Sequence, residues 1–215
     1  HNPTGCDLLP AQWAQVVQAV KTRGLVAFLD MAYQGFGDGI AEDGAVVQQF
    51  LAAGVDFLVA TSFSKSFSLY GERVGALSAV CADRDEAARV LSRLKVLIRT
   101  NYSNPPTHGA QLVATVLATP ALRRQWEDEL GGMRERIKHM RALLVQHLAA
   151  AGLQRDMGFI LQQKGMFSYS GLSAAQMQRL RNEFGVYGLD SGRICVAALN
   201  ERNLGPVVEA IAQVA

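Results

Sequence analysis

The segment ATSFSKSFSLYGERVG, residues 60–75, places one lysine, Lys65, between serines and phenylalanines at the end of an apolar run. A lysine amine held in a partly apolar setting can attack a carbonyl carbon and form an imine. Ser62, Ser64 and Arg73 lie close by and offer the hydroxyl and guanidinium donors that suit a phosphate dianion. The segment therefore predicts an aldehyde-reactive lysine beside a phosphate site, although Lys65 taken alone is also consistent with an ordinary loop lysine.

A carboxylate, Asp30, lies near the end of a second apolar run, VAFLDMAY, residues 26–33. An unpaired carboxylate in a buried strand is costly, so Asp30 needs either local hydrogen bonds or a cationic partner. An imine-forming lysine, a phosphate anchor and an anion that keeps a ring nitrogen protonated are together the requirements of pyridoxal 5'-phosphate. The three features predict that cofactor.

The elements that must position these residues alternate between helices and strands. The sequence predicts helices over 10–23 and 43–54 and strands over 25–33, 56–64 and 75–82. Nearly continuous apolar strands are typical of sheets covered on both faces, so we expect an α/β fold with an at least partly parallel sheet. Lys65 and Asp30 would then lie at the strand ends where such sheets bind ligands.

The second half of the chain is mostly helical up to about residue 151. A helix is expected over 84–100, and the stretch 110–151 should hold two or more helices because it contains Pro120 and the pair Gly131 and Gly132. The tail predicts a pair of short strands in 158–172, a helix after a Ser173 cap, a strand over 193–199 and a closing helix capped by Asn200. We therefore predict two domains, 1–151 with a bridging helix and a smaller α+β domain over 152–215.

The composition narrows the class of protein. The chain has 215 residues, of which 49% are hydrophobic and 19% charged, and its net charge is +2. No basic stripe indicates a nucleic-acid partner and no apolar run is long enough to span a membrane, so a cytoplasmic protein is expected. The three cysteines are too widely separated for a disulfide framework or paired zinc ligands, so we expect buried thiols and no metal.

Five motifs carry a resemblance to a known family. HNPTG, DMAYQGF, SFSKSFSLYGERVG, IRTNYSNPP and SGRICVA occur in the order and approximate spacing seen in the aspartate and aromatic amino acid aminotransferases of fold type I. The resemblance runs over residues 1–215. It implies part of the large pyridoxal-phosphate-binding domain sheet, followed by a smaller α+β C-terminal domain.

The resemblance also implies roles toward the cofactor. Lys65 matches the lysine that forms the imine with the cofactor and shuttles the substrate Cα proton, and Asp30 matches the partner of the pyridinium nitrogen. Tyr33 and Asn2 match the residues that hydrogen-bond the ring's phenolic oxygen. The matches to phosphate ligands are Ser62 and Arg73.

Further matches concern substrates and assembly. Arg193 matches the arginine that binds the substrate α-carboxylate, and Phe167 matches an aromatic residue near the substrate pocket. Arg99 matches the arginine that reaches across a dimer interface to a distal carboxylate, and Ser103 and Asn104 belong to the same interface segment. The resemblance thus implies a homodimer that acts on aromatic and dicarboxylic amino acids, with 2-oxoglutarate as the expected amino acceptor.

Whole family members are about twice this length, so we expect an incomplete chain that lacks an N-terminal half and alone binds the cofactor weakly. Two alternatives to an aminotransferase stay open. A catalytically silent fragment acting as a dimerisation module is one alternative. Another fold type I enzyme, a decarboxylase or lyase, is the second, although Arg193 and Arg99 favour transamination because decarboxylation needs the substrate carboxylate left unneutralised.

Overall fold

The computed structural model describes residues 1–215, which form two compact units. The sheet unit consists of Leu8–Gly35 and Gly39–Leu130. The C-terminal unit consists of His1–Asp7, Phe36–Asp38 and Gly131–Ala215. These units do not coincide with the predicted domains 1–151 and 152–215, and that division stays a prediction.

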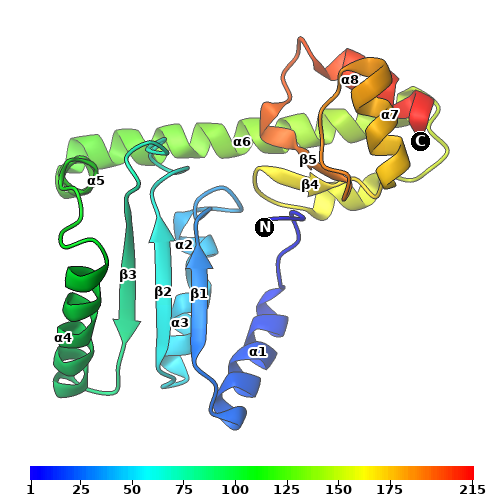
Figure 1. The fold of residues 1–215 in the computed structure, drawn as a ribbon. Coiled ribbons are helices and arrows are strands. Elements are labelled where there is room, and N and C mark those ends of the chain that lie inside the picture. The colour runs from blue at the N-terminus through cyan, green and yellow to red at the C-terminus, as the bar shows by residue number, and fades with distance from the viewer. The chain divides into compact units, whose positions relative to one another are not determined.

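The sheet unit alternates helices and strands in the predicted order (Figure 1). Its elements are α1 (Pro10–Arg23), β1 (Ala27–Met31), α2 (Ile40–Asp43), α3 (Ala45–Ala52), β2 (Phe57–Ser62), β3 (Gly75–Val80), α4 (Arg84–Asn101), α5 (His108–Ala118) and the first part of α6 (Pro120–Ala150). Strands β1 and β2 are parallel, and β3 pairs with β2 in the antiparallel sense. The expected α/β fold with a partly parallel sheet is confirmed.

Helix α1 illustrates how the sequence specifies its local structure. Pro10 occupies the first turn, where its missing N–H costs nothing, and Gly24 ends the helix in the left-handed conformation with φ 58°. The buried side chain of Val17 packs with Phe50 of α3 and with Phe57 of β2. Helices α1 and α3 therefore cover the same face of the sheet.

The opposite face of β1 is open in this structure. Ala27, Leu29 and Met31 pack against the core, whereas Phe28 is 61% exposed and Asp30 is exposed. Successive side chains of a strand point to opposite faces, and the helices of this unit contact only one of them. The prediction that this strand is covered on both faces is thus wrong for the described chain.

The C-terminal unit combines helices with a two-stranded antiparallel sheet. Its elements are the second part of α6, the 3-10 helix η1 (Gly158–Gln162), β4 (Phe167–Tyr169), α7 (Ala174–Phe184), β5 (Arg193–Cys195), the 3-10 helix η2 (Val196–Ala198) and α8 (Leu204–Val214). Its buried core includes Ile137, Met140, Leu144, Leu148, Ile160, Leu172, Met177, Leu180, Val196, Leu204, Val208 and Ile211. The helical segment 110–151 does divide into two helices, α5 and α6, and the division lies at Pro120, whereas α6 continues through Gly131 and Gly132.

Three local predictions for this chain are corrected by the structure. Residues 158–172 hold one 3-10 helix and one strand rather than two strands, because β4 takes its partner from β5. The closing helix α8 is preceded by Asn203, while the Asn200 side chain accepts hydrogen bonds from the backbone of the turn before it. The cysteines are not buried: Cys6 and Cys195 are exposed and Cys81 is half-buried.

None of the helices has the length and apolar character that crossing a lipid bilayer requires.

Candidate active site

Lys65 lies in a turn that directly follows β2 in the sheet unit. Its Nζ is 4.8 Å from the centroid of the Tyr33 ring and 4.9 Å from that of the Tyr70 ring. Aromatic faces attract an ammonium group without neutralising it. The two rings therefore position the Lys65 side chain just beyond the end of β2.

An aromatic cluster supports the Lys65 turn from α6. Trp126 donates a hydrogen bond from its ring N–H to the carbonyl oxygen of Ser66 at 2.7 Å. Its ring stacks on Phe67 with centroids 4.6 Å apart, and Phe67 meets Phe63 edge to face. Such pairs contribute about 0.5–1.5 kcal/mol each beyond the area that they bury. Sequence reasoning missed Trp126, since nothing in its helical context signals a partner 60 residues earlier.

Polar groups gather beside the turn. The Ser62 hydroxyl donates to Ser64 Oγ at 3.1 Å and accepts from the Ser64 amide at 3.2 Å. Arg73 donates from Nη1 to the carbonyl oxygen of Tyr70 at 2.9 Å, and its side chain is exposed. These donors belong to one short stretch of chain and match the chemistry of a phosphate site.

Two residues of this stretch adopt left-handed backbone conformations. Ser68 has φ 56° and Arg73 has φ 52°, although neither is a glycine. Left-handed geometry in such residues costs about 1–3 kcal/mol each and persists where the surrounding structure dictates it. The strain lies on both sides of Tyr70, within the segment that carries the predicted phosphate ligand.

Asp30 lies at the carboxyl end of β1, paired in register with Ala60 of the parallel strand β2. Lys65 follows the end of β2 by three residues. Parallel strands end at the same edge of a sheet, so the aspartate and the lysine share that edge, as the sequence predicted. Tyr33 follows β1 and reaches Lys65 through its ring.

Arg193 begins β5 in the C-terminal unit and is half-buried. Its guanidinium carbon lies 4.6 Å from the centroid of the Phe167 ring on β4. Its Nη1 donates to Oδ1 of Asn2 at 3.2 Å, across 191 residues of sequence. Three residues predicted separately for the substrate and the cofactor are thus brought together within this unit.

Backbone contacts fix the Asn2 segment beside β4. The Tyr169 amide donates to the carbonyl oxygen of Thr4 at 2.9 Å, and the Lys164 amide donates to that of Gly5 at 2.6 Å. Gly5 has φ 83°, and a Cβ atom there would lie 2.6 Å from the Phe167 carbonyl oxygen. Only glycine fits this close approach of two backbones.

Arg99 lies in the last turn of α4, is exposed and donates a hydrogen bond to Ser103 Oγ. Ser103 has a left-handed backbone with φ 69°. Asn104, the next residue, is also exposed, and its amide donates to the Tyr102 carbonyl oxygen at 2.9 Å. The predicted interface segment is therefore a surface turn in the described chain.

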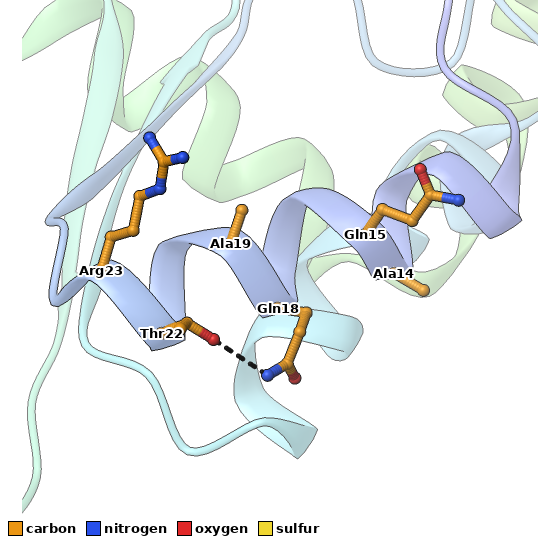
Figure 2. A pocket seen from close by; sticks show the side chains of 6 residues that line it. All are labelled: Ala14, Gln15, Gln18, Ala19, Thr22 and Arg23. Carbon is orange, nitrogen blue, oxygen red and sulfur yellow. Dashed lines mark hydrogen bonds between the residues drawn. The ribbon is translucent and has the colours of Figure 1, made fainter.

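A shallow hollow on α1 lies apart from these groups in the sequence. Figure 2 shows its lining, which comes from α1 alone: Ala14, Gln15, Gln18, Ala19, Thr22 and Arg23. The Gln18 amide donates to the Thr22 hydroxyl at 3.0 Å across one helical turn. None of the predicted site residues lines this hollow.

Comparison with known proteins decides the family. The family described as Aminotransferase class I and II matches residues 1–211. The chain belongs to this family. This class I and II aminotransferase chain is 60% identical over 214 residues to an aspartate aminotransferase of Pseudomonas aeruginosa, and 53% identical to an aromatic-amino-acid aminotransferase of Escherichia coli. In both cases the match takes in 100% of this chain and 54% of the relative.

A solved structure gives the same result. An aromatic-amino-acid aminotransferase from Burkholderia pseudomallei, described as covalently bound to pyridoxal phosphate, superposes with a TM-score of 0.98 and 64% identity. The superposition covers 100% of this chain and 54% of that one. The class I and II aminotransferase chain described here thus spans about half the length of the relatives it matches, and it has the fold type I architecture that its motifs predicted.

Proposed function

We propose that this chain supplies the lysine-bearing part of a pyridoxal-phosphate-dependent aminotransferase that moves an amino group between an amino acid and a 2-oxo acid. The observation that carries the proposal is the setting of Lys65, whose amine lies over the rings of Tyr33 and Tyr70 at the sheet edge shared with Asp30. Family membership and a relative described as covalently bound to pyridoxal phosphate support it.

The residues present fit the cofactor by their donor chemistry. Lys65 offers the amine, Ser62 and Arg73 offer hydroxyl and guanidinium donors for a phosphate, and Asp30 offers an exposed carboxylate for a protonated ring nitrogen. Tyr33 would donate to the phenolic oxygen, and the same role is predicted for Asn2. When bound, the cofactor supplies an electron sink for negative charge on the substrate Cα.

The remaining chemistry belongs to the chain's own side chains. Lys65 Nζ would take the proton from the substrate Cα and hold it for return, as a general base and then a general acid. Arg193 would bind the α-carboxylate through two parallel N–H bonds, with the Phe167 ring holding the plane of its guanidinium group. A carboxylate held in this way restrains the substrate before reaction, which would be an entropic contribution to the rate.

The assembly is also a proposal. We infer that the protein works as a homodimer in which Arg99 and the turn at Ser103 lie near the partner subunit's site. The motif match supports this role, as does the exposure of both residues in the described chain. An N-terminal half of the kind that the relatives possess is expected to complete the sheet unit. The cytoplasmic location stays a prediction.

The decisive experiment uses the protein at the full length of its relatives. Incubation with an aromatic amino acid and 2-oxoglutarate should form the aromatic 2-oxo acid and glutamate in equal amounts. Release of labelled carbon dioxide without oxo acid would indicate a decarboxylase instead. A protein that binds pyridoxal phosphate on Lys65 but forms neither product would favour the silent dimerisation module.

Substrate choice gives a sharper test of Arg99. We expect dual specificity, so Arg99→Leu should lower kcat/KM for aspartate by about 10–100-fold, the usual worth of charge-assisted hydrogen bonds. The value for phenylalanine should stay within about twofold, because that side chain carries no distal carboxylate. Steady-state kinetics on both substrates measure this, with Arg93→Leu on the exposed surface of the same helix as the control. Equal losses on both substrates would contradict the assignment.

A further inference from the structure

Arg141 of α6 is a buried charge in the C-terminal unit, with 3% of its surface exposed. Its Nη2 donates to the carbonyl oxygen of Gly165 at 2.7 Å and to that of Phe167 at 3.3 Å, and its Nε lies 3.4 Å from Ser168 Oγ. All of these acceptors are neutral. Burial lowers the pKa of the Arg141 guanidinium from its usual value, through desolvation of the charged form.

Such an arrangement is expensive for stability alone. Taking a guanidinium group out of water costs several kcal/mol, and a hydrophobic side chain of similar volume is often at least as stabilising. What an apolar residue cannot do is hold several carbonyl oxygens of one short segment at fixed positions. The planar guanidinium fork does this with little further loss of entropy.

The segment that Arg141 holds is the one that carries Phe167. Phe167 pairs in register with Cys195 of β5, and Tyr169 pairs with Arg193. The Phe167 ring in turn lies against the Arg193 guanidinium. A chain of direct contacts therefore runs from Arg141 through the Gly165–Phe167 backbone to the proposed carboxylate-binding group.

A second arginine of α6 holds the other strand. Arg136 donates to the carbonyl oxygen of Ala197 at 2.7 Å and to that of Leu199 at 2.9 Å, just beyond β5. The Ala197 amide donates to the Met166 carbonyl oxygen at 3.2 Å, so the two held segments are joined. Helix α6 thus fixes both strands of the small sheet through guanidinium–carbonyl bonds rather than through packing alone.

We propose that Arg141 is a positioning residue for substrate binding: it fixes the Gly165–Phe167 backbone so that Phe167 presents Arg193 in the orientation that receives a carboxylate. The inference rests on the proposed aminotransferase function and extends it to a residue that touches neither substrate nor cofactor. Loss of Arg141 should weaken the binding of carboxylate substrates more than it slows their conversion.

The test uses the full-length protein with Arg141→Lys and Arg141→Met. The lysine variant keeps the charge and can still donate to a carbonyl, so its KM should rise by only about two- to threefold, against about tenfold or more for the methionine variant. In both, kcat should stay within about threefold of the wild type. Arg179→Met, which removes an exposed guanidinium from α7 of the same unit, is the matched control and should change neither constant.

A second measurement is independent of turnover. Hydrogen exchange of the Tyr169 and Ala197 amides, which bond to Thr4 and Met166, should become faster in the order wild type, lysine variant, methionine variant. If Arg141→Met does not fold, the lysine variant carries the test, since it should show both the smaller KM increase and the faster exchange.

The outcomes separate the two proposals. Suppose that the wild type transaminates and that the KM values of both Arg141 variants stay as unchanged as that of the Arg179→Met control. This result would overturn the role of Arg141 and leave the proposed function standing. Equal loss in kcat and kcat/KM with unchanged amide exchange would overturn it as well. A wild-type protein without transaminase activity would overturn the proposed function itself, and the positioning role would fall with it.

Discussion

Lys65 and Arg193 are both cations held without a carboxylate partner, and the two units of the chain hold them by different means. The Lys65 amine lies over two tyrosine rings, in a turn supported by the stack of Trp126 on Phe67. Arg193 contacts the Phe167 ring and the side-chain amide of Asn2. The segment that carries Phe167 is held by the buried guanidinium group of Arg141. The lysine turn depends on aromatic packing, whereas the arginine site depends on hydrogen bonds to backbone carbonyls.

The difference follows from what each cation is proposed to do. A lysine side chain that reacts must be able to move, and ring faces attract its ammonium form without fixing one geometry. A carboxylate-binding guanidinium must present two N–H groups in one plane, so its plane has to be fixed in advance. Changes at Lys65 should therefore act mainly on turnover and changes at Arg193 mainly on binding.

The largest expected effect tests the lysine side of this comparison. In the full-length protein, Lys65→Ala should lower kcat by about 10⁴-fold or more, because it removes the general base together with the attachment point of the cofactor. Stopped-assay kinetics measure the loss, and borohydride reduction followed by mass spectrometry should place the trapped cofactor on Lys65 in the wild type. Lys95→Ala, an exposed lysine on α4, is the control. Trapping on another lysine would refute the assignment.

The arginine side predicts a smaller loss of a different kind. Arg193→Met should raise KM for every amino acid substrate by about 10²-fold, since removing one partner of a hydrogen-bonded charge pair costs about 2–5 kcal/mol. Arg193→Lys should recover only part of this, because an ammonium group cannot make the two parallel bonds. Steady-state kinetics with Arg202→Met as the exposed control check this. An increase in KM confined to dicarboxylic amino acids would mean that another residue binds the α-carboxylate.

Trp126→Phe tests the aromatic support more finely. The change removes the ring N–H bond to the Ser66 carbonyl and keeps a ring against Phe67. The loss should be about 1 kcal/mol in the stability of the full-length protein, which lowers its Tm. Cofactor affinity should also weaken by a few-fold. Thermal unfolding and a pyridoxal phosphate titration measure the two effects, with Trp13→Phe on α1 as the matched variant. An unchanged affinity would mean that the turn is held without Trp126.

The smallest expected effect is on stability and comes from an exposed ion pair of α7. In this pair a guanidinium group meets a carboxylate, whereas Arg141 meets only neutral acceptors. The hydrogen bond from Arg179 lowers the pKa of the Glu183 carboxyl. A carboxylate with a lowered pKa in the folded state stabilises the fold above its unfolded pKa of about 4.3 and loses this contribution as pH falls through the folded value.

The Glu183→Gln variant should therefore have a lower Tm than the wild type at pH 7. The difference between the two Tm values should become smaller as the solution is acidified toward pH 3. Calorimetry across this range measures the gap, with Glu201→Gln in the turn before α8 as the control. A gap that widens on acidification would contradict the sign of the shift. Kinetic constants should not change, because the pair lies on the exposed surface of its helix.

The sequence predicted most of the sheet unit because its signals are local. Pro10 and Gly24 delimit α1, and short apolar runs ending in Ser62 and Met31 mark the strands. It failed on the open face of β1, since an apolar run has the same composition whether one face or both are covered. It also failed for residues 158–172, where strand formation depends on a partner more than twenty residues later in the chain.

The candidate site divides in the same way. The residue types and spacing around Lys65, Asp30 and Arg73 predicted a chemistry, because an amine, an anion and a guanidinium group are recognisable wherever they lie, and the five motifs predicted the family. Only the tertiary structure decided which groups support them. Asn2 meets Arg193 across nearly the whole chain, and Trp126 and Arg141 reach carbonyl oxygens that no motif marks. The chemistry of a side chain depends on the residue type alone. A hydrogen bond to a distant backbone atom forms only once packing has fixed the positions of both the donor and the acceptor.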